Sequence, residues 1–215
     1  RRRSASAIDR RALVETVEGG LAAPCATWAA PSVAVWPASG GVTPPKRAVR
    51  VDDPLRLLVE DAPRERRLAR ALAAQIGATG LEVEVVAETG EELSRRLADG
   101  DYDLRIERTW GVPYDPYVSL TNRFLLPSRA RTAATDRFHG ADPEVSAWVE
   151  RATRTPDPAD LPGIYAAIQA RLDDAAGIVP LYAPHRLAVA RPGLVGLELD
   201  HDLYHLALDR VGRAE

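Results

Sequence analysis

The sequence predicts an α/β fold with a β-α-β-α-β core and a mixed sheet. Two largely apolar runs, residues 55–60 and 81–87, have the length of strands. Residues 102–109 alternate between apolar and polar side chains, which indicates a third strand with Leu104 and Ile106 on one face. The links between these runs are short, so we expect parallel strands joined by right-handed helical crossovers.

The residues before this core predict one helix and a long connection. Residues 7–18 carry a helical apolar face that ends at Gly19 and Gly20. Residues 22–54 are rich in proline and small side chains, which predicts an irregular segment. Four apolar side chains are expected to hold this segment against the protein surface: Trp28, Val33, Val35 and Trp36.

Within the core, the crossovers are predicted as helices over residues 63–76 and 89–98. Pro63 suits a first-turn position, and Thr89 with Glu92 has the form of a capping box. After the core, residues 116–142 lack a clean period and predict an irregular segment with a turn or two of helix.

The last third of the chain is predicted to contain two helices and several strands. Residues 143–153 and 157–175 have helical spacing of apolar side chains, and residues 178–183 and 186–191 are interpreted as strands. We expect three parts: residues 1–54 as a helix and connection, 55–193 as the ligand-binding lobe, and 194–215 as a segment that returns to another lobe.

Composition excludes several classes of protein and predicts no cofactor. The net charge is −3, which gives no reason to expect nucleic acid or an anionic membrane as a partner. Cys25 is the single cysteine, so it cannot form an internal disulfide. The nucleotide-binding loops, the zinc-protease motif and the serine-hydrolase elbow are all missing, which argues against an enzyme.

The segment Arg108-Thr-Trp-Gly-Val-Pro-Tyr-Asp-Pro116 follows the third predicted strand. Its two prolines restrict the backbone of the loop before any ligand arrives, so the loop would lose little entropy on binding. Ligands of open α/β sheets lie beyond the carboxyl ends of the strands, where this loop begins. We therefore interpret Trp110 and Tyr114 as ligand-binding side chains; the alternative is that Trp110 fills core.

This loop resembles the matching motif of the family 5 solute-binding proteins of bacterial ABC importers. Residues 7–14 with the glycine turn that follows, and the Pro-Leu-Tyr run at residues 180–182, resemble further segments of the same family in the same order. The resemblance is greatest to the nickel-binding branch. It implies a lobe of the type II periplasmic-binding-protein fold, which captures a small molecule, a peptide or a metal chelate in a cleft between two lobes. It also implies an extracytoplasmic location and delivery of the solute to an ABC permease in the membrane.

The matches belong to the C-terminal portion of that family, and the chain contains no methionine. We therefore expect a second lobe and a signal peptide in sequence that precedes residue 1. The surface that faces the second lobe is expected to make the isolated chain prone to self-association. An alternative from another class is the ligand-sensing domain of a cytoplasmic transcriptional regulator.

Three further residues are candidates for ligand contact. Arg108 pairs with a ligand carboxylate, buries its stem in a layer that covers the sheet, or pairs with Asp103 or Glu107. Arg129 follows Pro127-Ser128, where the nickel-binding branch has a histidine; an arginine favours an anionic ligand there, unless it belongs to a solvated basic patch with Arg123, Arg131 and Arg137. Tyr204 lies where the family's last segment borders the pocket. His139 would replace the missing imidazole only if its loop folds back, so no metal ligand is predicted.

Overall fold

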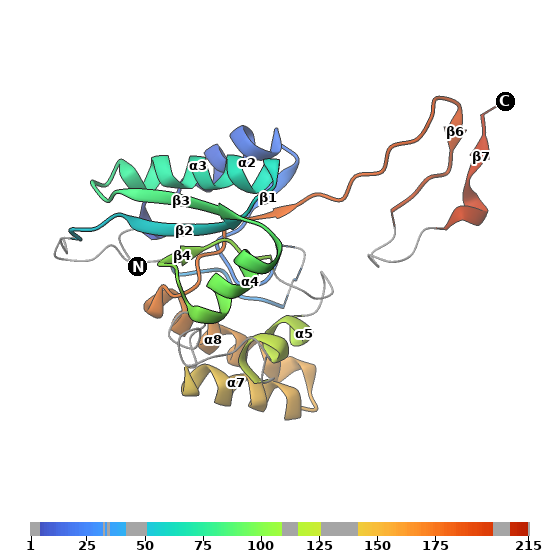
Figure 1. Cartoon of the computed structure of the whole chain (residues 1–215). Helices are drawn as coiled ribbons and strands as arrows, with labels where there is room; N and C mark the ends of the chain where they lie inside the picture. The colour runs from blue at the N-terminus through green and yellow to red at the C-terminus, as the bar shows by residue number, and fades with distance from the viewer. Residues whose placement is uncertain are drawn as a thin grey trace.

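A three-stranded parallel sheet, ordered β3-β2-β4, forms the centre of the structure (Figure 1). The structure is a computed structural model that describes residues 5–31, 33, 35–41, 51–108, 116–125, 142–199 and 207–214. The strands and helices of the core are β2 (Leu55–Glu60), α3 (Pro63–Gly77), β3 (Val83–Glu88), α4 (Gly90–Asp99) and β4 (Leu104–Arg105). This arrangement confirms the predicted β-α-β-α-β core.

The central strand β2 pairs in parallel with both of its neighbours. It matches β3 along its whole length, from Leu55 opposite Val83 to Glu60 opposite Glu88. It meets β4 only at Leu57 and Leu58, so β4 is much shorter than the strand predicted over residues 102–109. Side chains alternate along β2: Leu57 and Val59 join the apolar cluster with α3, while Leu58 is buried outside that cluster.

Helix α2 (Arg10–Glu18) packs beside α3 on one face of the sheet, as Figure 1 shows. Asp9 caps its N-terminus by accepting a hydrogen bond from the backbone N–H of Ala12, at 3.0 Å. Gly19 adopts the left-handed conformation with φ of 58°, which ends the helix at the predicted glycine turn. Leu13 and Val17 enter the same apolar cluster as α3 and β2.

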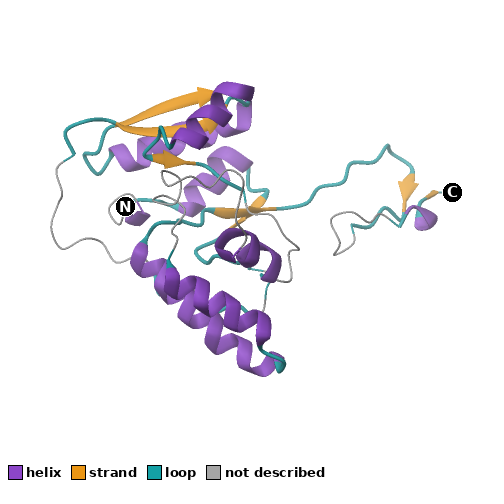
Figure 2. Ribbon diagram, turned by 60° about the horizontal axis from the view of Figure 1, so that its bottom comes forward, coloured by secondary structure: helices purple, strands orange, loops and turns teal. Residues whose placement is uncertain are grey.

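A second apolar cluster is built from helices that follow the sheet in sequence. These are α5 (Tyr117–Leu120), the π-helix η1 (Thr121–Leu125), α7 (Pro143–Arg154) and α8 (Leu161–Ala175), with the short 3-10 helix η2 (Pro158–Asp160) before α8. Figure 2 shows α7 and α8 side by side. Val33 and Trp36 of the loop-rich segment are buried in this cluster, whereas Val35 is 45% exposed and does not anchor the segment as predicted.

The two halves of the chain meet again at a small antiparallel pair, β1 (Ala22–Pro24) with β5 (Tyr182–Pro184). The guanidinium Nε of Arg10 lies 3.0 Å from the carbonyl oxygen of Cys25 and 2.9 Å from that of Pro180. The antiparallel pairing that we expected within one mixed sheet thus lies, among the described residues, in separate two-stranded sheets.

Beyond β5 the chain leaves the body as an extended arm (Figures 1 and 2). The strand predicted over residues 186–191 is wrong, because this segment forms no ladder with any described residue, and Val189 is 95% exposed. The arm ends in a small antiparallel sheet with a 3-10 helix before its second strand: β6 (Leu194–Val195), η3 (Leu208–Arg210) and β7 (Gly212–Arg213). None of the helices in the described residues is both long and apolar enough to span a membrane.

The predicted capping box at the start of α4 is also wrong. Thr89 occupies the N-cap position, but its side chain makes no capping hydrogen bond. Glu92 pairs instead with Arg95 and Arg96 on its own helix, at 2.7 and 3.1 Å. The hydrogen bonds from Arg95 are the main cause that lowers the pKa of Glu92 to about 2. The carboxylate of Glu92, which a capping box would require, is thus used in ion pairs on the helix surface.

Candidate functional site

The candidate site lies at the carboxyl edge of the parallel sheet. All three strands run in the same direction, so β2 ends at Glu60, β3 at Glu88 and β4 at Arg105 on one edge. Ligands of open α/β folds bind at this edge. The segment after β4 leads directly into the predicted aromatic loop.

A chain of five polar side chains crosses this region. Tyr182 donates a hydrogen bond from its hydroxyl to Glu18 Oε1 at 2.6 Å, and Arg64 donates to the same oxygen at 2.8 Å. Arg64 also lies 3.5 Å from the carboxylate of Glu65, which in turn accepts a hydrogen bond from Arg108. Glu18 belongs to α2, Arg64 and Glu65 to the first turn of α3, and Tyr182 to β5, while Arg108 lies three residues beyond the end of β4. We call this set the edge network.

The edge network is half-buried, and burial acts on its titratable groups. Burial, followed by the hydrogen bond to Glu18, raises the pKa of Tyr182. Burial alone would also raise the pKa of Glu65, but its own backbone N–H, Arg108 and Arg64 together bring that pKa below its ordinary value. Glu65 is therefore held in its ionised form. The guanidinium carbon of Arg64 lies 5.8 Å from the centre of the Tyr182 ring, in cation–π range.

A second cluster lies around Glu107, just beyond β4. Arg105 approaches Glu107 Oε2 to 2.6 Å, and Arg123 of η1 approaches the two oxygens of Glu107 to 3.0 and 2.8 Å. The Arg123 side chain is only 15% exposed, and burial is the main cause that lowers its pKa. Arg123 is therefore not part of a solvated basic patch, which corrects the alternative considered from the sequence. It fixes η1 to the end of β4.

The structure places one of the five predicted ligand-binding residues. Arg108 is two-thirds exposed at the carboxyl edge and pairs with Glu65, not with either of the carboxylates considered from sequence. The others lie outside the described residues: Trp110, Tyr114, Arg129 and Tyr204. So do His139, Arg131 and Arg137. Among the described residues, no group of histidine, cysteine, aspartate and glutamate side chains is arranged to hold a metal ion.

Sequence reasoning missed the partners of Arg108. Glu65 was part of a predicted helix start, Glu18 the end of another, and Tyr182 part of a strand motif. The only sequence signal for Glu65 was its position: the first turn of α3 follows the carboxyl end of β2, which places Glu65 near the candidate site. Nothing in the sequence pairs residues 18, 64 and 182 with one another.

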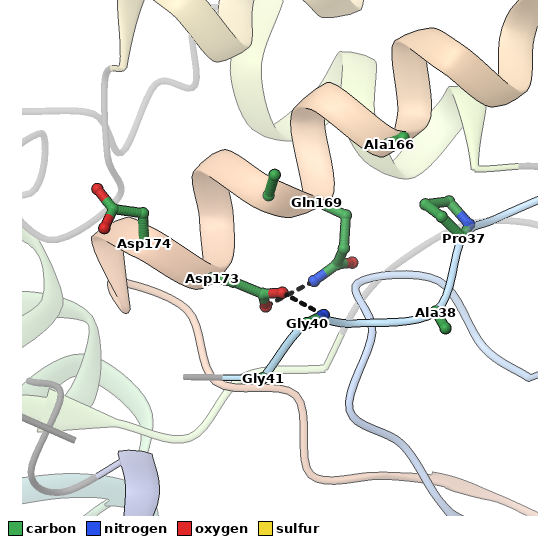
Figure 3. A pocket seen from close by; sticks show the side chains of 9 residues that line it. Pro37, Ala38, Gly40, Gly41, Ala166, Gln169, Asp173 and Asp174 are labelled. Atoms are coloured by element: carbon green, nitrogen blue, oxygen red, sulfur yellow. Dashed lines mark hydrogen bonds between the residues drawn. The ribbon is translucent and has the colours of Figure 1, made fainter. Parts of the chain in front are cut away.

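A separate cavity of about 320 Å³ lies between α8 and residues 37–41, as Figure 3 shows. Asp173 forms its polar wall and accepts hydrogen bonds from Ser39 Oγ at 2.8 Å and from the backbone N–H of Gly40 at 3.1 Å. Gln169 donates to the other oxygen of Asp173. The cavity includes none of the predicted ligand-binding residues.

Comparison with known proteins identified a sequence relative but no matching family model. No protein-family model matches the chain. Over 128 residues it is 28% identical to the nickel-binding periplasmic protein of Escherichia coli (strain K12), a match covering 59% of the chain and 24% of that protein. The matched part of the chain thus spans about a quarter of the length of that relative.

Two solved structures share its fold. NikA from Brucella suis in complex with Fe(III)-EDTA superposes with a TM-score of 0.77 at 19% identity, covering 99% of this chain and 47% of that one. The dipeptide-binding protein from Pseudoalteromonas sp. SM9913 in complex with Met-Leu gives 0.76 at 15% identity, covering 99% and 45%. The expected fold class and the resemblance to solute-binding proteins are confirmed. These relatives are binding proteins, which agrees with the expectation that the chain is no enzyme.

Proposed function

We propose that this solute-binding-protein-like chain supplies one lobe of the extracytoplasmic receptor of an ABC importer. The observation that carries the proposal is the position of the edge network at the carboxyl edge of a parallel sheet, in a chain whose fold matches receptors crystallised with a chelate and with a dipeptide. The resemblance to transport receptors favours this function over the sensor domain of a transcriptional regulator.

In this proposal the solute is a peptide, nickel or a metal chelate. It binds beyond the carboxyl edge, between this lobe and a second one, and closure of the two lobes excludes water before delivery to a membrane permease. Residues 1–54 lead in from the second lobe, 55–193 form the ligand-binding lobe and 194–215 return. Trp110 and Tyr114 supply the aromatic contacts, Arg108 and Arg129 the cationic ones, and Tyr204 borders the pocket.

The test is the substitution Trp110→Ala in the full-length receptor. Affinity for the solute should fall by roughly 1–3 kcal/mol, the usual range for the loss of a buried aromatic contact in a binding site. The unfolding temperature without ligand should change little, because a side chain that serves ligand contact contributes little to the core. Calorimetry measures the first quantity and thermal unfolding the second. A large loss of apo stability with unchanged affinity would show that Trp110 is a core residue.

A further inference from the structure

We propose that Arg108 is a carboxylate-binding residue that exchanges its partner Glu65 for a carboxylate of the bound solute. The inference rests on the proposed function and names the chemistry of the solute: it carries at least one carboxylate. A peptide C-terminus and a carboxylate chelate of a metal share this group.

The first step of the argument is the asymmetry of the Arg108–Glu65 ion pair. The side chain of Arg108 is 66% exposed, whereas that of Glu65 is 14% exposed. Only the tip of the Arg108 guanidinium is held, through Nη2. Because solvent reaches most of the Arg108 side chain, an anion in the cleft can compete with Glu65 for the guanidinium.

The second step is that Glu65 has other partners besides Arg108. It lies in the first turn of α3, where the positive end of the helix dipole stabilises a carboxylate. Arg64 remains 3.5 Å away, and the backbone N–H of Glu65 also favours its ionised form. When Arg108 leaves, Glu65 loses two of the interactions that lower its pKa, but it keeps its own backbone N–H, Arg64 and the N-terminus of α3 as compensating partners.

The third step is that the rest of the edge network is closed to the solute. Arg64 is about one-quarter exposed and already donates to both oxygens of Glu18, at 2.8 and 3.2 Å. In the neighbouring cluster, outside the edge network, Arg123 is buried against Glu107. Arg108 thus combines exposure, a replaceable partner and a place at the carboxyl edge. Its forked donors suit a carboxylate.

The experiment measures binding of four probes to the full-length receptor by calorimetry: Met-Leu, Met-Leu with an amidated C-terminus, Fe(III)–EDTA and Ni²⁺. The variants are R108Q, E65Q and the double variant. R108Q should weaken binding of a carboxylate probe about tenfold, the equivalent of one charge-assisted hydrogen bond. E65Q should strengthen it up to about fivefold, because the competing carboxylate is gone. In the R108Q background, E65Q should change nothing.

Two control variants change the net charge in the same way at positions away from the Arg108–Glu65 pair. Arg95 is an exposed, ion-paired arginine on α4, and Glu91 is an exposed acid in the first turn of that helix. R95Q and E91Q should leave affinity within about twofold if only the general field of the protein acts on them. A gain with E91Q as large as that with E65Q would overturn the exchange.

The probes separate the sources of the carboxylate. A tenfold loss for Met-Leu and none for the amide assigns the peptide C-terminus, while a loss for Fe(III)–EDTA assigns a chelate. If the unchanged receptor and the R108Q variant bind a carboxylate probe equally well, the proposed partner exchange is wrong, while the proposed function stands. A receptor that binds none of the four probes would contradict the proposed function and the exchange together.

Discussion

At the scale of single residues, Gln169 shows how one polar side chain organises an apolar cluster. It is 3% exposed, and its Oε1 accepts hydrogen bonds from the backbone N–H of Trp28 at 3.0 Å and from Trp36 Nε1 at 2.7 Å. Its Nε2 donates to Asp173 at 2.8 Å. The side chain therefore holds the loop-rich segment against α8.

We predict that Gln169→Leu lowers the free energy of unfolding by about 2–4 kcal/mol, because two buried donors lose their acceptor. Urea denaturation measures this change. The matched control is Gln75→Leu, which removes hydrogen bonds to Asp9 on the surface and should cost less than about 1 kcal/mol. Equal costs at the two positions would contradict the role assigned to Gln169.

Tyr182 makes the free energy of unfolding depend on pH in the alkaline range. Its pKa is above its ordinary value of 10.0, mainly through burial and then through Glu18, so the folded state holds the phenolic proton more tightly than the unfolded state. This contribution to stability is fully present below pH 10 and is lost as the pH rises above 10, towards the folded-state pKa.

Tyr182→Phe should therefore reduce stability at pH 7 by about 1 kcal/mol through the lost hydrogen bond, yet make the decline above pH 10 shallower. Chemical denaturation at pH 7 to 11.5 tests both signs. Lys46 is the single lysine of the sequence, so lysine titration adds little to the profile. The control is the exposed Tyr117→Phe. If stability declines above pH 10 as steeply in Tyr182→Phe as in the unchanged protein, Tyr182 is not the cause of the decline.

Residue positions were predictable where they depend on local spacing, and partners were not. The alternation of residues 102–109 predicts Arg108 near the end of a strand; in the structure β4 ends at Arg105, and Arg108 follows three residues later. Its pairing with Glu65, 43 residues away, depends on how α3 packs on the sheet. The burial of Arg123, which the sequence left as a possible member of a solvated patch, was not predictable for the same reason, because Glu107 reaches it only once η1 has folded against β4.

At the scale of elements, β2 and α3 were predicted almost to the residue, because apolar spacing and Pro63 define them locally. The strand predicted over residues 186–191 failed. A strand needs a partner as well as a suitable sequence, and the described residues offer it none. The capping box failed because arginines one turn further along α4 compete for Glu92.

The C-terminus of helix α8 ends at a residue in the left-handed conformation, and substitution by glycine tests this assignment. Ala176, its C-cap, has φ of 47°, a left-handed conformation that costs free energy for any residue with a Cβ atom. Ala176→Gly should stabilise the protein by about 0.5–1 kcal/mol. Ala175→Gly, one residue earlier within the helix, should instead destabilise it by about 1 kcal/mol. Thermal unfolding compares the two; a loss of stability at both positions would contradict the assigned cap.

At the scale of the whole molecule, two apolar clusters and a projecting arm determine how the chain behaves. The clusters lie around α3 with β2 and around α7 with α8. Which cluster a segment joins was not predictable, because helical spacing defines an apolar face and not its partner.

The arm exposes Leu187 and Val189, which are 62% and 95% accessible. We therefore expect self-association of the 215-residue chain at micromolar to millimolar concentration. Sedimentation velocity over a concentration series measures it, with the double variant L187S/V189S as comparison. A chain that stays monomeric throughout would contradict this expectation.

The central claim is that this chain supplies one lobe of a binding site shared by two. Calorimetric titration of residues 1–215 with Ni²⁺ and with Met-Leu tests it most directly. Half of the contacts and an open cleft should give dissociation constants of millimolar or weaker, a binding free energy of about −4 kcal/mol at most. Micromolar binding by residues 1–215 alone would place the complete site within this chain and contradict the shared pocket.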